Sequence, residues 1–75
     1  MSDGRYAVVL FHSTSHALRA ERVLLAEHVL CKLIPVPRHL SSDCGVCVRV
    51  EAASREAVLR ALDGAGVEIE GIHSL

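Results

Sequence analysis

Hydrophobic and polar positions form six consecutive blocks along the chain, and the period of the pattern changes from block to block. The first block, 6–11 (YAVVLF), is apolar on both faces, which is typical of a central strand. Blocks 29–37 and 45–51 predict two further strands, and the alternation in 67–72 predicts a fourth. Two helical blocks separate these strands, so the chain is predicted to follow the order βαββαβ.

The two helical blocks each begin near a serine that can cap a helix. Ser13 or Ser15 precedes the first helix, and Ser54 begins the second, 54–66 (SREAVLRALDGAG), which its two glycines are expected to stop. Spacings of three and four predict the buried stripe of the first helix. That stripe consists of Ala17, Leu18, Ala20, Leu24, Leu25 and His28.

The prolines of the second strand restrict its place in the sheet. Pro35 and Pro37 stand at alternate positions, so both missing N–H donors point the same way and the strand must lie at an edge. A ferredoxin-like α+β fold meets this requirement, with a four-stranded antiparallel sheet in the order 4-1-3-2 and two helices on one face. We therefore predict this fold for a single domain, 1–75, because the chain is too short for a second core.

The face without helices is predicted to carry one apolar set from the first strand. The set is either Tyr6, Val8 and Leu10 or its alternate. An uncovered apolar sheet face favours self-association, so a homodimer is expected.

Composition and charge exclude several classes of protein. The net charge of −1 and the aromatic content of 3% provide neither the field nor the stacking surface of a nucleic-acid-binding domain. No apolar run approaches the ~20 residues that cross a bilayer, and no signal peptide is recognisable, which predicts a cytoplasmic protein without a membrane partner. Three cysteines, an odd number, predict free thiols rather than a disulfide framework.

The thiol of Cys44 is the leading candidate for chemistry. The proposed topology places the loop before the third strand at the same end of the sheet as His12, Ser13 and the start of the first helix. Helix N–H groups and the charge of Arg38 would lower the pKa of this thiol, whereas the adjacent Asp43 would raise it. The alternative is a small buried thiol at the start of the strand.

Cys44 and Cys47 form a C-x-x-C pair, which suggests a dithiol or a metal site. In an extended strand the two Cα atoms lie about 10 Å apart and the side chains point to opposite faces, whereas a disulfide needs roughly 4.4 to 6.8 Å. Cys47 is therefore a possible second thiol only if Cys44 and Gly45 belong to the loop. Zinc ligation by both thiols with His12 and His16 is chemically reasonable, although the spacing matches no known ligand signature.

Two segments, 11–21 (FHSTSHALRAE) and 32–45 (KLIPVPRHLSSDCG), resemble the Se/S carrier protein-like family of small bacterial and archaeal proteins. The resemblance covers nearly the whole chain. It implies a carrier without enzymatic activity or cofactor that holds sulfur or selenium on Cys44 and exchanges it with donor and acceptor proteins. The family's motif positions around that cysteine map onto Phe11, His12, Ser13, Glu21, Pro35, Pro37, Arg38, Ser41, Ser42 and Gly45, and Cys47 is an addition to the pattern.

Three hypotheses follow from the sequence. The first is the chalcogen carrier, in which His12, Ser13, Arg38, Ser41, Ser42 and Gly45 surround the reactive thiol. The second is a non-catalytic binding or regulatory module that dimerises or docks through its open sheet face. The third is a Cys/His metal-binding domain.

Overall fold

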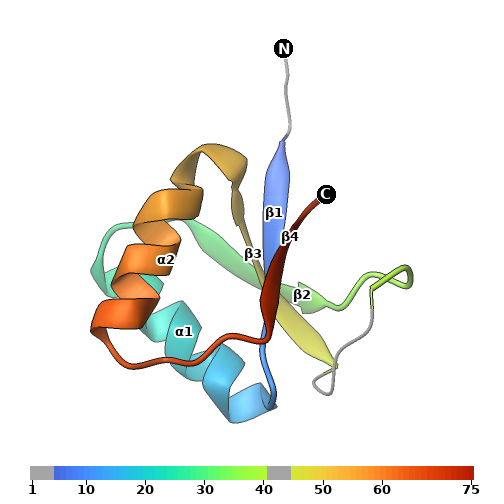
Figure 1. Ribbon diagram of the computed structural model, residues 1–75, viewed down its shortest axis with the longest axis horizontal. Coiled ribbons are helices and arrows are strands. Elements are labelled where there is room, and N and C mark those ends of the chain that lie inside the picture. Colours follow the sequence, from blue (N-terminus) through green and yellow to red (C-terminus); the bar gives the residue numbers. More distant parts are fainter. Residues whose placement is uncertain (1–4, 41–44) are drawn as a thin grey trace.

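The computed structural model describes residues 5–40 and 45–75, so Ser41, Ser42 and Cys44 lie outside the described residues. The sheet has the order β2-β3-β1-β4, with each neighbouring pair antiparallel, which confirms the predicted ferredoxin-like topology. Figure 1 shows both helices on one side of this sheet. The elements are β1 (Tyr6–Leu10), α1 (Thr14–Ala26), β2 (Cys31–Pro35), β3 (Val46–Glu51), the 3₁₀ turn η1 (Ala52–Ser54), α2 (Arg55–Gly64) and β4 (Gly71–Ser74).

The main core lies between the sheet and the two helices. β1 is central, and Val9 stands opposite Val48 of β3 and Ile72 of β4. Valines and alanines predominate among the buried residues of this layer, which include one aromatic side chain, Phe11. The buried members are Ala7, Val9, Phe11, Ala17, Ala20, Leu24, Val48, Val50, Val58, Leu62 and Val67.

Helix α1 confirms one of the two predicted caps and narrows the predicted stripe. Ser13 is the N-cap, and its Oγ accepts a hydrogen bond from the backbone N–H of His16 at 3.3 Å. The prediction that Leu18, Leu25 and His28 are buried is wrong. The two leucines are 44% and 52% exposed because they lie beside the line of contact with the sheet, and His28 follows the helix with φ 61°. The buried stripe consists of Ala17, Ala20 and Leu24.

Helix α2 starts after η1 rather than directly at a serine cap. Ser54 occupies the N-cap position, but its side chain makes no capping hydrogen bond. The helix ends at Gly64, and Gly66 follows with φ 70°, a left-handed conformation that glycine adopts without strain. The predicted stop at the two glycines is therefore confirmed.

The predicted bounds of the outer strands need correction. β2 is shorter than 29–37 because Val29 donates to the Leu24 carbonyl at the end of α1, and a turn begins at Pro37. β4 covers Gly71–Ser74 rather than 67–72. The alternation that predicted it reflects the burial of Val67 beside α2, and pairing with β1 starts only where Glu70 donates to the Leu10 carbonyl at 2.7 Å.

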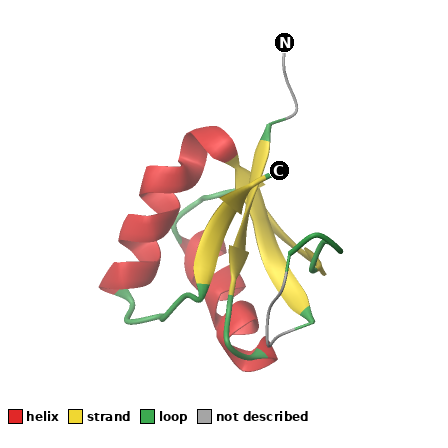
Figure 2. Cartoon of the chain, turned by 45° about the vertical axis from the view of Figure 1, so that its right-hand side comes forward, coloured by secondary structure: helices red, strands yellow, loops and turns green. Residues whose placement is uncertain are grey.

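The sheet surface that faces away from the helices is called the open face below. It carries Val8, Leu10 and Cys47, whose exposed fractions are 0%, 2% and 0%. The predicted uncovered apolar set is therefore wrong, because the chain covers it with its own side chains. Figure 2 shows the loop after β2 on the side of the sheet away from α2, and the covering residues are Ile34, Val36 and Leu40.

Candidate functional site

The ends of three strands meet where the sequence predicts the site. Leu10 at the end of β1 is opposite Cys47, and Pro35 at the end of β2 is opposite Val46. The backbone N–H of Val36 donates to the Gly45 carbonyl at 3.2 Å, and this bond closes the β2–β3 hairpin. Gly45, the residue after Cys44, therefore lies at the same end of the sheet as the residues that follow β1.

Those residues, His12 and Ser13, lead into α1. The Ser13 hydroxyl lies 2.6 Å from Nδ1 of His16 and 3.1 Å from the Ser15 hydroxyl, in addition to its capping bond. Its role in the described structure is thus to organise the first turn of α1, while His12 is exposed. The first turn of α1 contains no acidic residue of its own, so the positive end of the helix dipole lies at this end of the sheet. Glu70, whose backbone N–H donates to the Leu10 carbonyl, lies at the same end.

Arg38 lies on the other side of the sheet end. The chain from Val36 to Leu40 packs on the open face, and a turn closes it where Leu40 donates to the Pro37 carbonyl at 3.0 Å. Arg38 is exposed within that turn. His12 and Ser13 therefore flank the start of β3 from the helix layer, whereas Arg38 belongs to the open-face side.

Gly45 is exposed, and a Cβ built on it would meet no atom within 4 Å. Its backbone carbonyl is already bound to Val36. The described surroundings thus leave free space beside the residue that directly follows Cys44.

The two described cysteines are poor candidates for an exposed thiolate. Cys47 is 0% exposed, and its Sγ lies 3.9 Å from the Pro35 carbonyl. Cys31 is half-buried, its Sγ lies 3.9 Å from the Glu21 carbonyl, and burial followed by the nearby Glu21 charge raises its pKa. A raised pKa lowers the fraction of Cys31 present as reactive thiolate at neutral pH.

The part of the chain that the structure describes contains no candidate metal site and no candidate membrane-spanning helix. Residues 5–40 and 45–75 contain no group of three or more His, Cys, Asp or Glu side chains that could hold a metal ion. Neither helix in these ranges is long and apolar enough to cross a bilayer.

Sequence reasoning missed a basic cluster on the open face. Lys32 of β2 is opposite Arg49 of β3, and the Arg49 guanidinium carbon lies 4.3 Å from the centre of the Tyr6 ring. A signal was present, because the two cations interrupt the apolar pattern of two strands predicted to form a hairpin. The two cations can be recognised as neighbours only once the register of that hairpin is known.

Comparison with known proteins gives one family. A family model described as "Putative Se/S carrier protein-like" matches residues 6–74. A search of curated proteins finds no match. No solved structure matches either.

Proposed function

We propose, since the chain belongs to the Se/S carrier protein-like family, that it carries sulfur or selenium on Cys44 between a donor and an acceptor protein. The family match across 6–74 is the observation on which the proposal rests. The two described thiols support the choice of residue, because Cys47 is fully buried and the pKa of Cys31 is raised. Cys44 is the remaining cysteine.

The proposed chemistry is a transfer of sulfane sulfur without net oxidation. The Cys44 thiolate attacks the terminal sulfur of a persulfide on the donor, a new S–S bond forms, and the donor's S–S bond breaks as its thiolate leaves. The terminal sulfur on Cys44 then carries the negative charge. An acceptor thiolate removes this sulfur in the same way and regenerates the Cys44 thiolate, and a selenium atom would follow the same course as a selenosulfide.

Anion-stabilising groups near the sheet end support this chemistry. The start of α1, whose first turn contains no acidic residue, would favour a thiolate or a persulfide anion. We assign His12, Ser13 and Arg38 to its surroundings, with Ser41 and Ser42 supplying hydrogen bonds from the loop. The site works with a single thiol, so it requires neither Cys47 nor a metal.

Intact-mass spectrometry tests the proposal directly. The protein is incubated with a cysteine desulfurase and cysteine, or with selenite and excess thiol as reductant, and then weighed without reduction. We expect an adduct of one sulfur or one selenium atom on the wild type and on Cys47→Ser, and none on Cys44→Ser. The absence of an adduct on the wild type, or an equal adduct on Cys44→Ser, would show that the proposal is wrong.

A further inference from the structure

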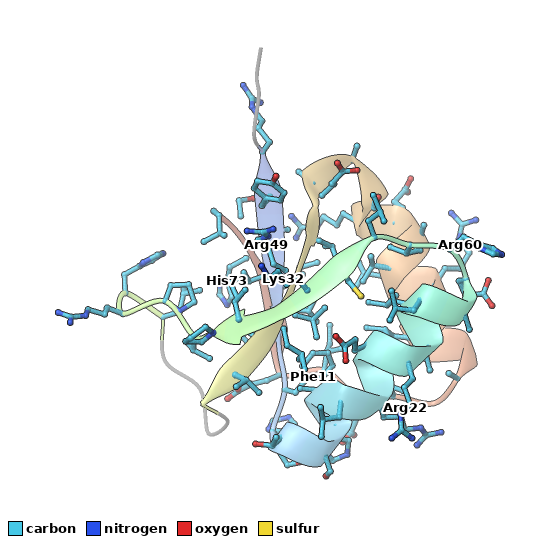
Figure 3. All side chains as sticks on the ribbon, turned by 180° about the vertical axis from the view of Figure 1, so that it is seen from behind. Phe11, Arg22, Lys32, Arg49, Arg60 and His73 are labelled. Carbon is cyan, nitrogen blue, oxygen red and sulfur yellow. The ribbon has the colours of Figure 1, made fainter. Side chains whose placement is uncertain are left out.

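A row of basic side chains crosses the open face beside its apolar cluster. Lys32 of β2 stands opposite Arg49, Arg49 stands opposite Val8 of β1, and Val8 stands opposite His73 of β4. Opposite residues of antiparallel strands project from the same face with Cβ atoms about 4.5–5.5 Å apart. Figure 3 shows Lys32, Arg49 and His73 gathered on the sheet, with Arg22 and Arg60 on the helices to one side.

The cations of this row have no carboxylate partner in the described part of the chain. Lys32 is exposed, and no ion pair joins it or Arg49 to residues 5–40 or 45–75. The Arg49 guanidinium, 4.3 Å from the centre of the Tyr6 ring, is held along the sheet by a cation–π contact. The guanidinium carries five N–H donors, so one contact with a ring leaves most of them able to bind an acceptor.

A shallow depression lies at the same place and has a volume of about 260 Å³. Small-molecule sites usually measure roughly 300–1,000 Å³, so this depression suits one protruding side chain better than a cofactor. Its charged lining favours an anionic group, and its apolar lining favours a neighbouring hydrophobic one. The residues around it include Tyr6, Leu30, Lys32, Arg49 and Glu51.

Charge is distributed unevenly between the two sides of the molecule. Among the described residues, the open face and the segment that covers it carry the cations Lys32, Arg38 and Arg49 and the acid Glu51. The helices and the segments that follow them carry more acids than cations, namely Glu21, Glu27, Glu56, Asp63, Glu68 and Glu70 against Arg19, Arg22, Arg55 and Arg60. The net charge of −1 for the whole chain conceals this asymmetry.

We propose that the open face is a docking surface for an acidic patch on the protein that exchanges sulfur or selenium with this chain. The identity of that partner rests on the proposed function, whereas the preference for an acidic protein surface rests on the unpaired cations alone. Arg49 and Gly45 are four residues apart along one side of the sheet, about 13 Å for an extended strand. A partner bound over the basic row would therefore lie about 13 Å from Gly45, the residue that follows Cys44 in the sequence.

The same observations disfavour two other occupants. A second copy docked face to face would bring two basic rows together, and like charges repel. A nucleic acid needs several phosphate contacts and aromatic platforms for bases, whereas the described open face offers one aromatic ring, Tyr6, which already contacts Arg49. An acidic protein surface needs only the few cations and the small depression that are present.

The docking surface is tested by NMR with a synthetic peptide of alternating Glu and Leu as the probe. The ¹⁵N-labelled wild type is titrated alongside Lys32→Glu/Arg49→Glu and the matched control Arg22→Glu/Arg60→Glu, which makes the same charge change on exposed helix positions. The single variant Lys32→Glu is included because loss of the Arg49–Tyr6 contact could destabilise the fold. A peptide of alternating Lys and Leu and a short single-stranded RNA serve as competing probes.

We expect the acidic peptide to shift amide signals of the open face and to bind the double variant at least tenfold more weakly, with a smaller loss in Lys32→Glu and none in the control. Salt should weaken binding, because screening reduces attraction between exposed charges. Shifts on the helix layer, an undiminished affinity of the folded Lys32→Glu variant, or tighter binding of the basic peptide or the RNA would overturn the proposal.

Sulfur loading separates docking from the proposed function. A small persulfide donor needs no docking surface, so it should load the wild type and all variants equally, whereas a cysteine desulfurase should load the open-face variants roughly tenfold or more slowly at low salt. Failure of the small donor to load the wild type would overturn the carrier function while the NMR result still decides docking. Equal desulfurase rates for the folded wild type and open-face variants would overturn the assignment of the partner.

Discussion

Alkylation of the native protein by iodoacetamide tests the exclusion of Cys47 from solvent, on which the single-thiol interpretation depends. The side chain is 0% exposed and packs with Val8 and Leu10 on a strand that has neighbours on both sides. Ile34, Val36 and Leu40 cover this cluster. The reagent can therefore reach Cys47 only after these covering side chains leave the open face, either by local opening of β2 and the segment that follows it or by opening of the whole sheet.

The size of the protection follows from the stability expected for a chain of this length. At roughly 0.05–0.15 kcal/mol per residue, the free energy of unfolding is about 4–11 kcal/mol. An opening that costs about 5 kcal/mol leaves roughly one molecule in several thousand accessible, so alkylation of Cys47 should be about 10³–10⁴-fold slower than that of free cysteine.

The assay is a timed alkylation at neutral pH, followed by digestion and quantification of the Cys47 peptide by mass spectrometry. The same reaction in denaturant provides the unprotected rate, and the Cys31 peptide is an internal comparison, because this thiol is only half-buried. Circular dichroism verifies that the protein stays folded during labelling. Alkylation of Cys47 within tenfold of the denatured rate in a folded sample would refute the reasoning and restore the C-x-x-C pair as a candidate.

Three further predictions concern stability. Ser13→Ala should lower the free energy of unfolding by about 1 kcal/mol in urea denaturation, because a capping hydrogen bond is lost. The Ser54 side chain makes no such bond, so Ser54→Ala should change the free energy of unfolding by much less. Equal losses would contradict the assignment of the caps. Leu24→Ala should cost about 2–5 kcal/mol and the exposed Leu18→Ala under about 0.5 kcal/mol; similar costs would mean that the stripe is wrongly placed. In the folded protein the pKa of Cys31 is raised above its ordinary value of 9.0. Its contribution to stability is therefore complete below pH 9.0 and is lost as the pH rises toward the folded pKa. Cys31→Ala should remove this part of the fall in the free energy of unfolding at alkaline pH, measured by urea denaturation, and an unchanged fall would contradict the shift.

The sequence was most informative where local pattern and local chemistry agree. The alternation of Val46, Val48 and Val50 with Cys47 and Arg49 predicted both faces of β3, because successive side chains of a strand point to opposite sides. The two prolines predicted that β2 lies at an edge, because a missing N–H cannot be tolerated in a central ladder. Ser13 could be named as one of two candidate caps because a helix cap depends only on hydrogen bonds within one turn of the chain.

Predictions that depended on long-range packing were less successful. The alternation in 67–72 was interpreted as a strand. It arises instead because Val67 is buried beside α2, and β4 begins only at Gly71. The predicted buried stripe of α1 included exposed residues such as Leu18 and Leu25, because periodicity does not show how much of a helix surface contacts the sheet. Both errors come from contacts between residues that are distant in the chain.

The sequence by itself determined the order of the elements, the edge position of β2, the free state expected for the thiols and the motif that relates the chain to its family. Only the tertiary structure decided that Val36 and Leu40 fold over the open face, because this depends on the path of a loop that has no periodic pattern. The registers of β3 against β2 and of β1 against β3 and β4 also brought Lys32, Arg49 and His73 into one row. Charges far apart in the chain become neighbours through strand pairing, so the docking surface could be recognised only in the folded protein.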